Sequence, residues 1–289
     1  MAAEDFAIVT DSACDVCPEE LSSWGVRCVN LQVSDQAGNP LASDNSPANV
    51  EAFYDWMATH DELPKTSMPT PLDFGQLYSE LARQGYKRII SLHLPEVMSG
   101  TCNCARMAAQ SAPVPVDVVD LRRNTLAQGL LVRRAAQMRA DGCSADEVLA
   151  ALEETGPACS ICFAVDQLDN LVKGGRVGRA TGLVANMLDI KPILTVGPDG
   201  AVDSIGMAKS MKRAVNRLVK HAEELVAELG PLEGYLVHVR NTKALEALRA
   251  GLADKAVAFA ELGVRQVGPI IATHVGLGCV GFAYIPPRG

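Results

Sequence analysis

The sequence has no long apolar run and no excess of positive charge. Nothing in its 289 residues approaches the roughly 18 to 20 apolar residues that span a bilayer; the longest candidates are short stretches such as Ile161 to Val165. Lysine and arginine number 26 against 34 aspartates and glutamates, a net charge of −8. Proteins that bind nucleic acid usually carry a basic surface. We therefore expect neither an integral membrane segment nor a nucleic-acid partner.

The beginning of the chain lacks the positive charge that opens a secretion signal. Glu4 and Asp5 stand there, and a strand pattern starts directly afterwards at Phe6. The nine cysteines are odd in number and scattered, which favours reduced thiols over a disulfide framework. These features predict a cytoplasmic protein.

Motifs for metal binding are also weak. Two Cys-x-x-Cys pairs occur, Cys14 with Cys17 and Cys159 with Cys162, but they lie far apart compared with the pairs of a zinc ribbon. The second pair falls in a predicted buried strand, where residues three apart face opposite sides. We expect no metal site.

Nucleotide-binding and nucleophile motifs are missing as well. The sequence contains no P-loop, kinase signature or nucleophile elbow. Gly276 to Gly281 matches G-x-G-x-x-G, but the eight residues after Gly281 are too few for the helix and the acidic residue of a dinucleotide site. These glycines instead indicate a tight turn or a close backbone approach beside His274. We expect no cofactor.

The composition is that of a globular chain, with 48% hydrophobic and 21% charged residues. Its length favours two domains. Up to about Gly156, strand and helix patterns alternate, which indicates a mostly parallel sheet covered on both faces. The predicted strands are Phe6–Thr10, Val26–Val33, Arg88–Leu94 and Val114–Val119, and the predicted helices are Glu51–Thr59, Leu72–Arg83, Thr101–Gln110, Leu126–Ala140 and Ala145–Glu154.

The pattern changes after Gly156. A glycine-rich basic segment, Lys173 to Arg179, is followed by two strands separated by the turn signal Gly197-Pro198-Asp199-Gly200, which predicts an antiparallel hairpin. The remaining predicted elements are a helix at Lys209–Leu229, a strand at Tyr235–Val239, a helix at Thr242–Leu252 and strands near Val264 and Val280. We therefore predict an α/β domain over residues 1–157 and an α+β domain over residues 158–289.

Three hydroxyl-rich positions are placed to bind an anionic oxygen. Thr66 to Pro71 precedes a predicted helix, and Ser99-Gly100-Thr101 lies between a strand and a helix, where unpaired amides attract anions. Asp11-Ser12 ends the first strand, the edge at which α/β sheets bind ligands. The alternative interpretation makes Thr70 and Ser99 ordinary N-caps, Asp11-Ser12 a cap or turn, and His274 a structural histidine.

Six blocks taken in order resemble the DegV family of bacterial fatty-acid-binding proteins along nearly the whole chain. They are Ile8–Ser12 with Asp15, Thr66-Ser67-Met68-Pro69, Ser99–Thr101, Lys173–Arg176, Ile190–Leu194 followed by Asp199-Gly200, and Gly268-Pro269 leading to Thr273, His274, Gly276 and Gly278. The resemblance implies a three-layer α/β/α domain with a mostly parallel sheet and a two-layer α+β domain with a mixed sheet. A long-chain fatty acid would lie in the cleft between them.

The resemblance also implies which residues hold the fatty acid. The carboxylate would be bound by Thr66, Ser99 and His274. Ser67, Gly100, Thr101, Asp11 and Ser12 would lie near this head group. The family's role implies a carrier for phospholipid synthesis, which presents its ligand to a separate fatty acid kinase for acyl-phosphate formation. Arg176 and Lys173 are the candidate kinase contacts, in a segment expected to be flexible and cationic.

Several positions depart from the family pattern. Met68 replaces a glutamine, Pro95 and Glu96 replace a pair of serines, and Leu277 replaces a proline. Glu96 would repel an anion if it faced the head group.

Two other functions are compatible with the residues. The first is a hydrolase or phosphotransferase with Ser99 as nucleophile, His274 as base and Asp11 as the group that orients it, although no nucleophile motif supports it. The second is a carrier of the same fold for a small molecule that is not a lipid.

Overall fold

The first half of the chain builds a parallel sheet. The computed structural model describes residues 6–42, 44–186 and 190–288. The sheet has the strand order β2-β1-β6-β7, with every neighbouring pair parallel. Its strands are β1 (Phe6–Asp11), β2 (Val26–Val29), β6 (Arg88–His93) and β7 (Val116–Asp120), and the helices of this half are α1 (Pro18–Ser23), α2 (Pro47–Thr59), α3 (Pro71–Arg83), α4 (Thr101–Ala109), α5 (Thr125–Ala140) and α6 (Ala145–Thr155).

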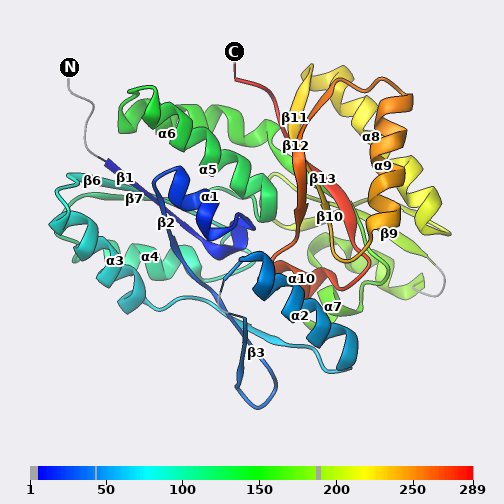
Figure 1. Cartoon of the computed structure of the whole chain (residues 1–289), viewed down its shortest axis with the longest axis horizontal. Helices are drawn as coiled ribbons and strands as arrows, with labels where there is room; N and C mark the ends of the chain where they lie inside the picture. The colour runs from blue at the N-terminus through cyan, green and yellow to red at the C-terminus, as the bar shows by residue number, and fades with distance from the viewer. Residues whose placement is uncertain (1–5, 43, 187–189, 289) are drawn as a thin grey trace.

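Helices cover both faces of this sheet, because its central strands are apolar on both sides. Phe6 and Ile8 of β1 pack in one cluster with the apolar residues of α5, whereas Ala7 and Val9 pack with those of α3 and α4. This alternation follows from the two-residue period of a strand. Figure 1 shows α5 and α6 on one side of the sheet and α3 and α4 on the other. The predicted three-layer arrangement is confirmed.

The second half builds a mixed sheet with the strand order β10-β9-β8-β13-β11-β12. The pair β11 and β12 is parallel and the other pairs are antiparallel. The predicted hairpin is present as β9 and β10. The strands are β8 (Ser160–Ala164), β9 (Lys191–Val196), β10 (Val202–Ala208), β11 (Leu232–His238), β12 (Phe259–Gln266) and β13 (Val280–Ile285), and the helices are α7 (Asp169–Lys173), α8 (Met211–Leu229), α9 (Thr242–Asp254) and α10 (Pro269–Val275).

The two faces of the mixed sheet have different partners. One face packs under α8 and α9. The other joins the main core, where Ile161 and Phe163 lie in one cluster with Leu126 and Leu130 of α5. Cys162 belongs to the first face and Cys159 to the second, so this pair cannot share a metal. Within the described residues, no group of three or more His, Cys, Asp or Glu side chains is placed to hold a metal ion, and no helix is long and apolar enough to cross a membrane.

The prediction of one strand from Val26 to Val33 is wrong. β2 ends at Val29, where its pairing with β1 ends. The chain then joins a third, antiparallel sheet of order β4-β3-β5, formed by β3 (Gln32–Ser34), β4 (Pro40–Ala42) and β5 (Lys65–Ser67). The apolar pattern continues through this region because both segments are buried on one side, but the partner strand changes.

Candidate functional site

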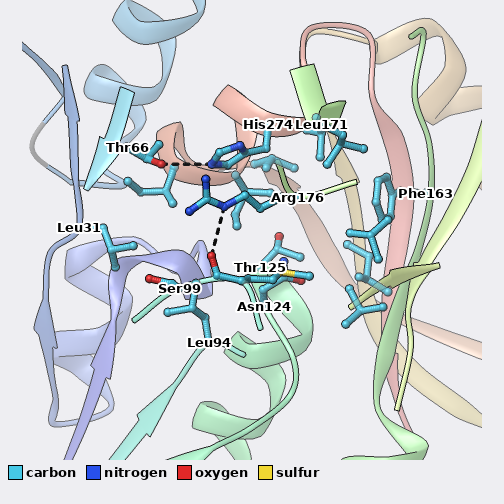
Figure 2. Close-up of a pocket in the computed structure, with 18 of the residues that line it drawn as sticks. Leu31, Thr66, Leu94, Ser99, Asn124, Thr125, Phe163, Leu171, Arg176 and His274 are labelled. Carbon is cyan, nitrogen blue, oxygen red and sulfur yellow. Dashed lines mark hydrogen bonds between the residues drawn. The ribbon is translucent and has the colours of Figure 1, made fainter. Parts of the chain in front are cut away.

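A cavity lies where the three sheets approach one another. Most of its wall is aliphatic or aromatic, including Ile161, Phe163, Val237 and Ile271. The polar residues in the wall are Thr66, Ser67, Ser99, Asn124, Thr125, Arg176 and His274, and Figure 2 shows several of them clustered opposite Phe163.

Thr66 and His274 meet at one end of this cavity. Thr66 Oγ1 lies 3.2 Å from His274 Nε2, although the residues are 208 positions apart in the chain. Thr66 is placed by β5, where it pairs with Val33 of β3. His274 is carried by α10, which is fixed to α7 by the Asn170 side chain donating to the Thr273 carbonyl at 3.0 Å. The tertiary structure therefore brings together two of the three predicted carboxylate ligands.

The His274 ring is neutral near pH 7. Burial lowers its pKa to about 4, and the neighbouring Arg176 guanidinium also acts to lower it. A neutral ring has one N–H donor and one acceptor. Nδ1 has no hydrogen-bond partner among the residues that the structure describes, and it faces Gly174. A Cβ on Gly174 would lie 2.5 Å from Nδ1, so the ring position requires glycine there.

Ser99 is the third predicted ligand, and it lines the same cavity. Its Oγ lies 2.9 Å from Thr101 Oγ1. Helix α4 begins after Gly100, without a side-chain cap, so the alternative interpretation of Ser99 as an N-cap is wrong. The same interpretation is confirmed for Thr70, which caps α3 and forms a capping box with Asp73.

Arg176 lies across the cavity opening and is not part of a free loop. Its Nε donates to the Met98 carbonyl at 3.2 Å and one terminal nitrogen donates to the Gly174 carbonyl at 2.6 Å. Arg179 forms ion pairs with Asp199 and Asp203 at 2.6 and 3.0 Å. Both arginines of this segment therefore have partners within the described structure. Lys173 lines a neighbouring cavity instead of this one.

Asp11 does not line the cavity but bonds to the backbone of Leu94, which does. Its Oδ2 accepts hydrogen bonds from the Leu94 amide at 3.1 Å and is 2.8 Å from His93 Nδ1. Ser12 Oγ accepts from the Leu31 amide at 2.9 Å. Leu31 and Leu94 line the cavity, whereas Asp11 and Ser12 do not.

The triad of the hydrolase alternative is not assembled around Asp11. Its carboxylate is bonded to His93, and the Nε2 of His93 lies 2.7 Å from Ser91 Oγ. These three side chains are completely buried, so no substrate reaches them. The only sequence signal for His93 is that it alternates with Ser91 on one face of a strand.

The positions that depart from the family pattern have identifiable surroundings. Glu96 forms an ion pair with Arg106 and does not line the cavity, so it does not face the head-group end. Met68 does line the cavity, and its sulfur lies against Gly100. Pro95 packs against Gly200 of the β9–β10 turn.

A buried carboxyl group behind the cavity makes stability depend on pH. Asp15 Oδ2 accepts from the Thr125 hydroxyl at 2.5 Å, and Oδ1 has no partner among the described residues. Burial raises the pKa of Asp15 from 3.8 to about 8. Between these two pH values the folded state keeps a proton that the unfolded chain has released. The contribution of this proton to the free energy of unfolding is complete below pH 3.8 and is lost as the pH rises to about 8.

We expect Asp15→Asn to remove this dependence, because asparagine imitates the protonated carboxyl. Between pH 6 and 9 the wild type should lose about 2 to 3 kcal/mol more unfolding free energy than Asp15→Asn does. Urea unfolding of both proteins at the two pH values measures the difference. Equal losses would show that Asp15 is not the titrating group.

Comparisons with known proteins agree on one family. A family model described as the DegV family of uncharacterised proteins matches residues 5–287. A DegV domain-containing protein of Deinococcus radiodurans is 35% identical over 281 residues, which are 97% of this chain and 98% of that protein. One of Streptomyces coelicolor is 31% identical over 278 residues, which are 95% of this chain and 96% of that protein.

Solved structures give the same result. A fatty-acid-binding DegV family protein from Thermus thermophilus is 30% identical, with a TM-score of 0.89 and coverage of 98% of this chain and 100% of that chain. A Thermotoga maritima protein with a fatty-acid-binding function is 27% identical, with a TM-score of 0.85 and coverage of 98% and 99%.

Proposed function

The chain belongs to the DegV family, and from this premise we propose that it is a carrier that binds a long-chain fatty acid between its two halves. We further propose that it presents the carboxyl group to a separate fatty acid kinase for acyl-phosphate formation in phospholipid synthesis. The two halves would be domains of residues 1–157 and 158–289, since the strands of the parallel sheet precede this boundary and those of the mixed sheet follow it. Nine free thiols support a place in the cytoplasm.

The observation that carries the proposal is a cavity that is apolar along most of its wall and polar at its opening. Ile161, Phe163 and Val237 are buried, whereas Ser67 and Arg176 are exposed. Burying about 15 methylenes at about 0.8 kcal/mol each gives roughly 12 kcal/mol of gross driving force. Hydrogen bonds to a carboxylate add only a few kcal/mol. The tail would therefore supply affinity and the polar end would supply orientation.

The carboxylate would be bound by the Thr66 and Ser99 hydroxyls and the His274 ring, with Arg176 as the nearby positive charge. The hydroxyls can donate directly to a carboxylate oxygen. His274 is neutral, so it offers one N–H and does not need to be charged before the ligand arrives. Arg176 is held by two backbone carbonyls, which are neutral and do not offset its positive charge.

We expect Thr66→Val and Ser99→Ala each to weaken fatty-acid binding by about 1.5 to 3 kcal/mol, the range for a hydrogen bond to a charged group. Both variants should fold, because neither hydroxyl caps a helix. Titration calorimetry with hexadecanoic acid measures the loss, and Thr70→Val, at a capping residue outside the cavity, is the matched control. Unchanged affinity in both variants would remove these hydroxyls from the head-group site.

Ligand retention tests the carrier proposal itself. Protein purified from a bacterial host should carry about one fatty acid per chain, since a largely apolar cavity favours an apolar ligand where lipid is abundant. Native mass spectrometry gives the stoichiometry, and denaturing extraction should release the acid. Ligand-free protein that also fails to bind added hexadecanoic acid would contradict the proposal, and turnover of a chromogenic acyl ester would favour the hydrolase alternative.

A further inference from the structure

A second polar position lies inside the cavity, at the start of α5. Asn124 precedes this helix, and its side chain does not cap the helix. The residue is only 8% exposed and lines the cavity. Its Nδ2 donates to the Met98 sulfur at 3.3 Å, and within the described part of the chain Oδ1 has no hydrogen-bond partner.

One end of this amide lacks a strong hydrogen-bond partner in either orientation of the amide. A thioether sulfur is a weak acceptor and no donor, so turning the amide by 180° would leave Nδ2 without a strong partner instead. A buried amide oxygen without a donor is destabilising. The geometry therefore favours a ligand that supplies a hydrogen-bonding group here.

Neighbouring residues hold Asn124 in place but donate no hydrogen bond to its Oδ1 within the described structure. Thr125 follows it with a φ of +49°, a strained conformation for a β-branched residue. The Thr125 hydroxyl is engaged by the buried Asp15 carboxyl at 2.5 Å. The strain and this hydrogen bond fix the start of α5 against the cavity.

Asn124 lies close to the head-group end. The Met98 side chain contacts its amide, and the Met98 carbonyl accepts from Arg176. Figure 2 shows Asn124 and Thr125 on the opposite side of Arg176 from His274 and Thr66. A fatty acid whose carboxylate reaches Thr66 and His274 would place its first few carbons past Arg176, beside Asn124.

We infer that the cavity selects a fatty acid with a hydroxyl group near its carboxyl end; this rests on the fatty-acid-binding function proposed above. A hydroxyl can donate to Asn124 Oδ1 and, at the same time, accept from an amide in the first turn of α5. A methylene at the same place does neither and leaves the amide oxygen unpaired. Sites built to bond a hydroxyl discriminate strongly against analogues that lack it.

Competition between acids of equal length tests this inference. Delipidated wild-type protein should bind 3-hydroxyhexadecanoic acid at least about tenfold more tightly than hexadecanoic acid, and the two enantiomers should bind unequally because the amide is fixed. The isomer 16-hydroxyhexadecanoic acid should show no such gain. Asn124→Leu should lose the preference for the 3-hydroxy acid and still bind hexadecanoic acid.

The outcomes separate this inference from the proposed function. Equal affinity for hexadecanoic and 3-hydroxyhexadecanoic acid in the wild type, with water satisfying the amide, would overturn the selectivity and leave the carrier function standing. A preference that persists unchanged in Asn124→Leu would overturn the role of Asn124. If Asn124→Leu does not fold, Asn124→Asp should keep the preference, because it retains the acceptor. Failure of both acids to bind would overturn the carrier function itself.

Discussion

Ile161→Trp is expected to reduce the affinity for hexadecanoic acid by at least about 100-fold. Ile161 is buried on β8 and lines the cavity together with Phe163, its neighbour on the same strand face. An indole in this position occupies space that several methylenes of the acyl chain would fill. Excluding four of them removes about 3 kcal/mol of burial, which is more than 100-fold in affinity. Fluorescence displacement with fatty acids of increasing length measures the loss.

The length dependence distinguishes a blocked cavity from a damaged fold. Octanoic acid should bind Ile161→Trp and wild type with affinities within about threefold of each other, because a short chain leaves methylene space unused. Ile161→Leu conserves volume and serves as the matched control. A uniform loss for all chain lengths, together with a lowered thermal midpoint, would mean that the substitution disturbs the sheet and that the tail does not lie beside β8.

The sequence predicts the sheets well where a local pattern and the tertiary partner agree. The apolar strand at Phe6 and the turn signal at Gly197 to Gly200 each determine their own structure, and both predictions are confirmed. The prediction of one strand from Val26 to Val33 is wrong because no local pattern indicates the change of sheet after Val29. That change depends on Leu31, whose amide bonds to Ser12 Oγ, a contact between residues 19 positions apart.

Likewise, the sequence predicts only part of the candidate site. The resemblance of motifs predicts that Thr66, Ser99 and His274 lie together. A periodic pattern cannot predict this, because Thr66 and His274 are 208 positions apart in the chain. The sequence places Arg176, a candidate kinase contact, in a glycine-rich basic segment, a pattern that is also typical of a solvated loop. Its position depends on the Met98 carbonyl, which the sequence does not reveal. Asn124 carries no motif, and only its burial without a partner for Oδ1 in the described structure distinguishes it.

The proposed partnership with a kinase leads to a second prediction, which concerns acyl-phosphate formation. Neither a P-loop nor a kinase motif occurs in the sequence, so we expect isolated, lipid-loaded protein with ATP and magnesium to form no acyl phosphate. Adding a DegV-partner kinase should start the reaction. Capture of the acyl phosphate as a hydroxamate measures the rate in both cases. ATP-dependent product from the isolated chain would refute the division of labour between carrier and kinase.

Arg176→Ala should lower this kinase-dependent rate by at least about 100-fold. Arg176 is the charged side chain at the cavity opening, and a planar guanidinium can bind both a carboxylate and a transferring phosphoryl group, whose developing charge needs a nearby cation. Arg179→Ala is the matched control, because Arg179 is three residues away and already neutralised by Asp199 and Asp203. Arg176→Lys should restore only part of the rate, since it keeps the charge without the fork. Similar rates for Arg176→Ala and Arg179→Ala would mean that the charge at the opening has no part in the transfer.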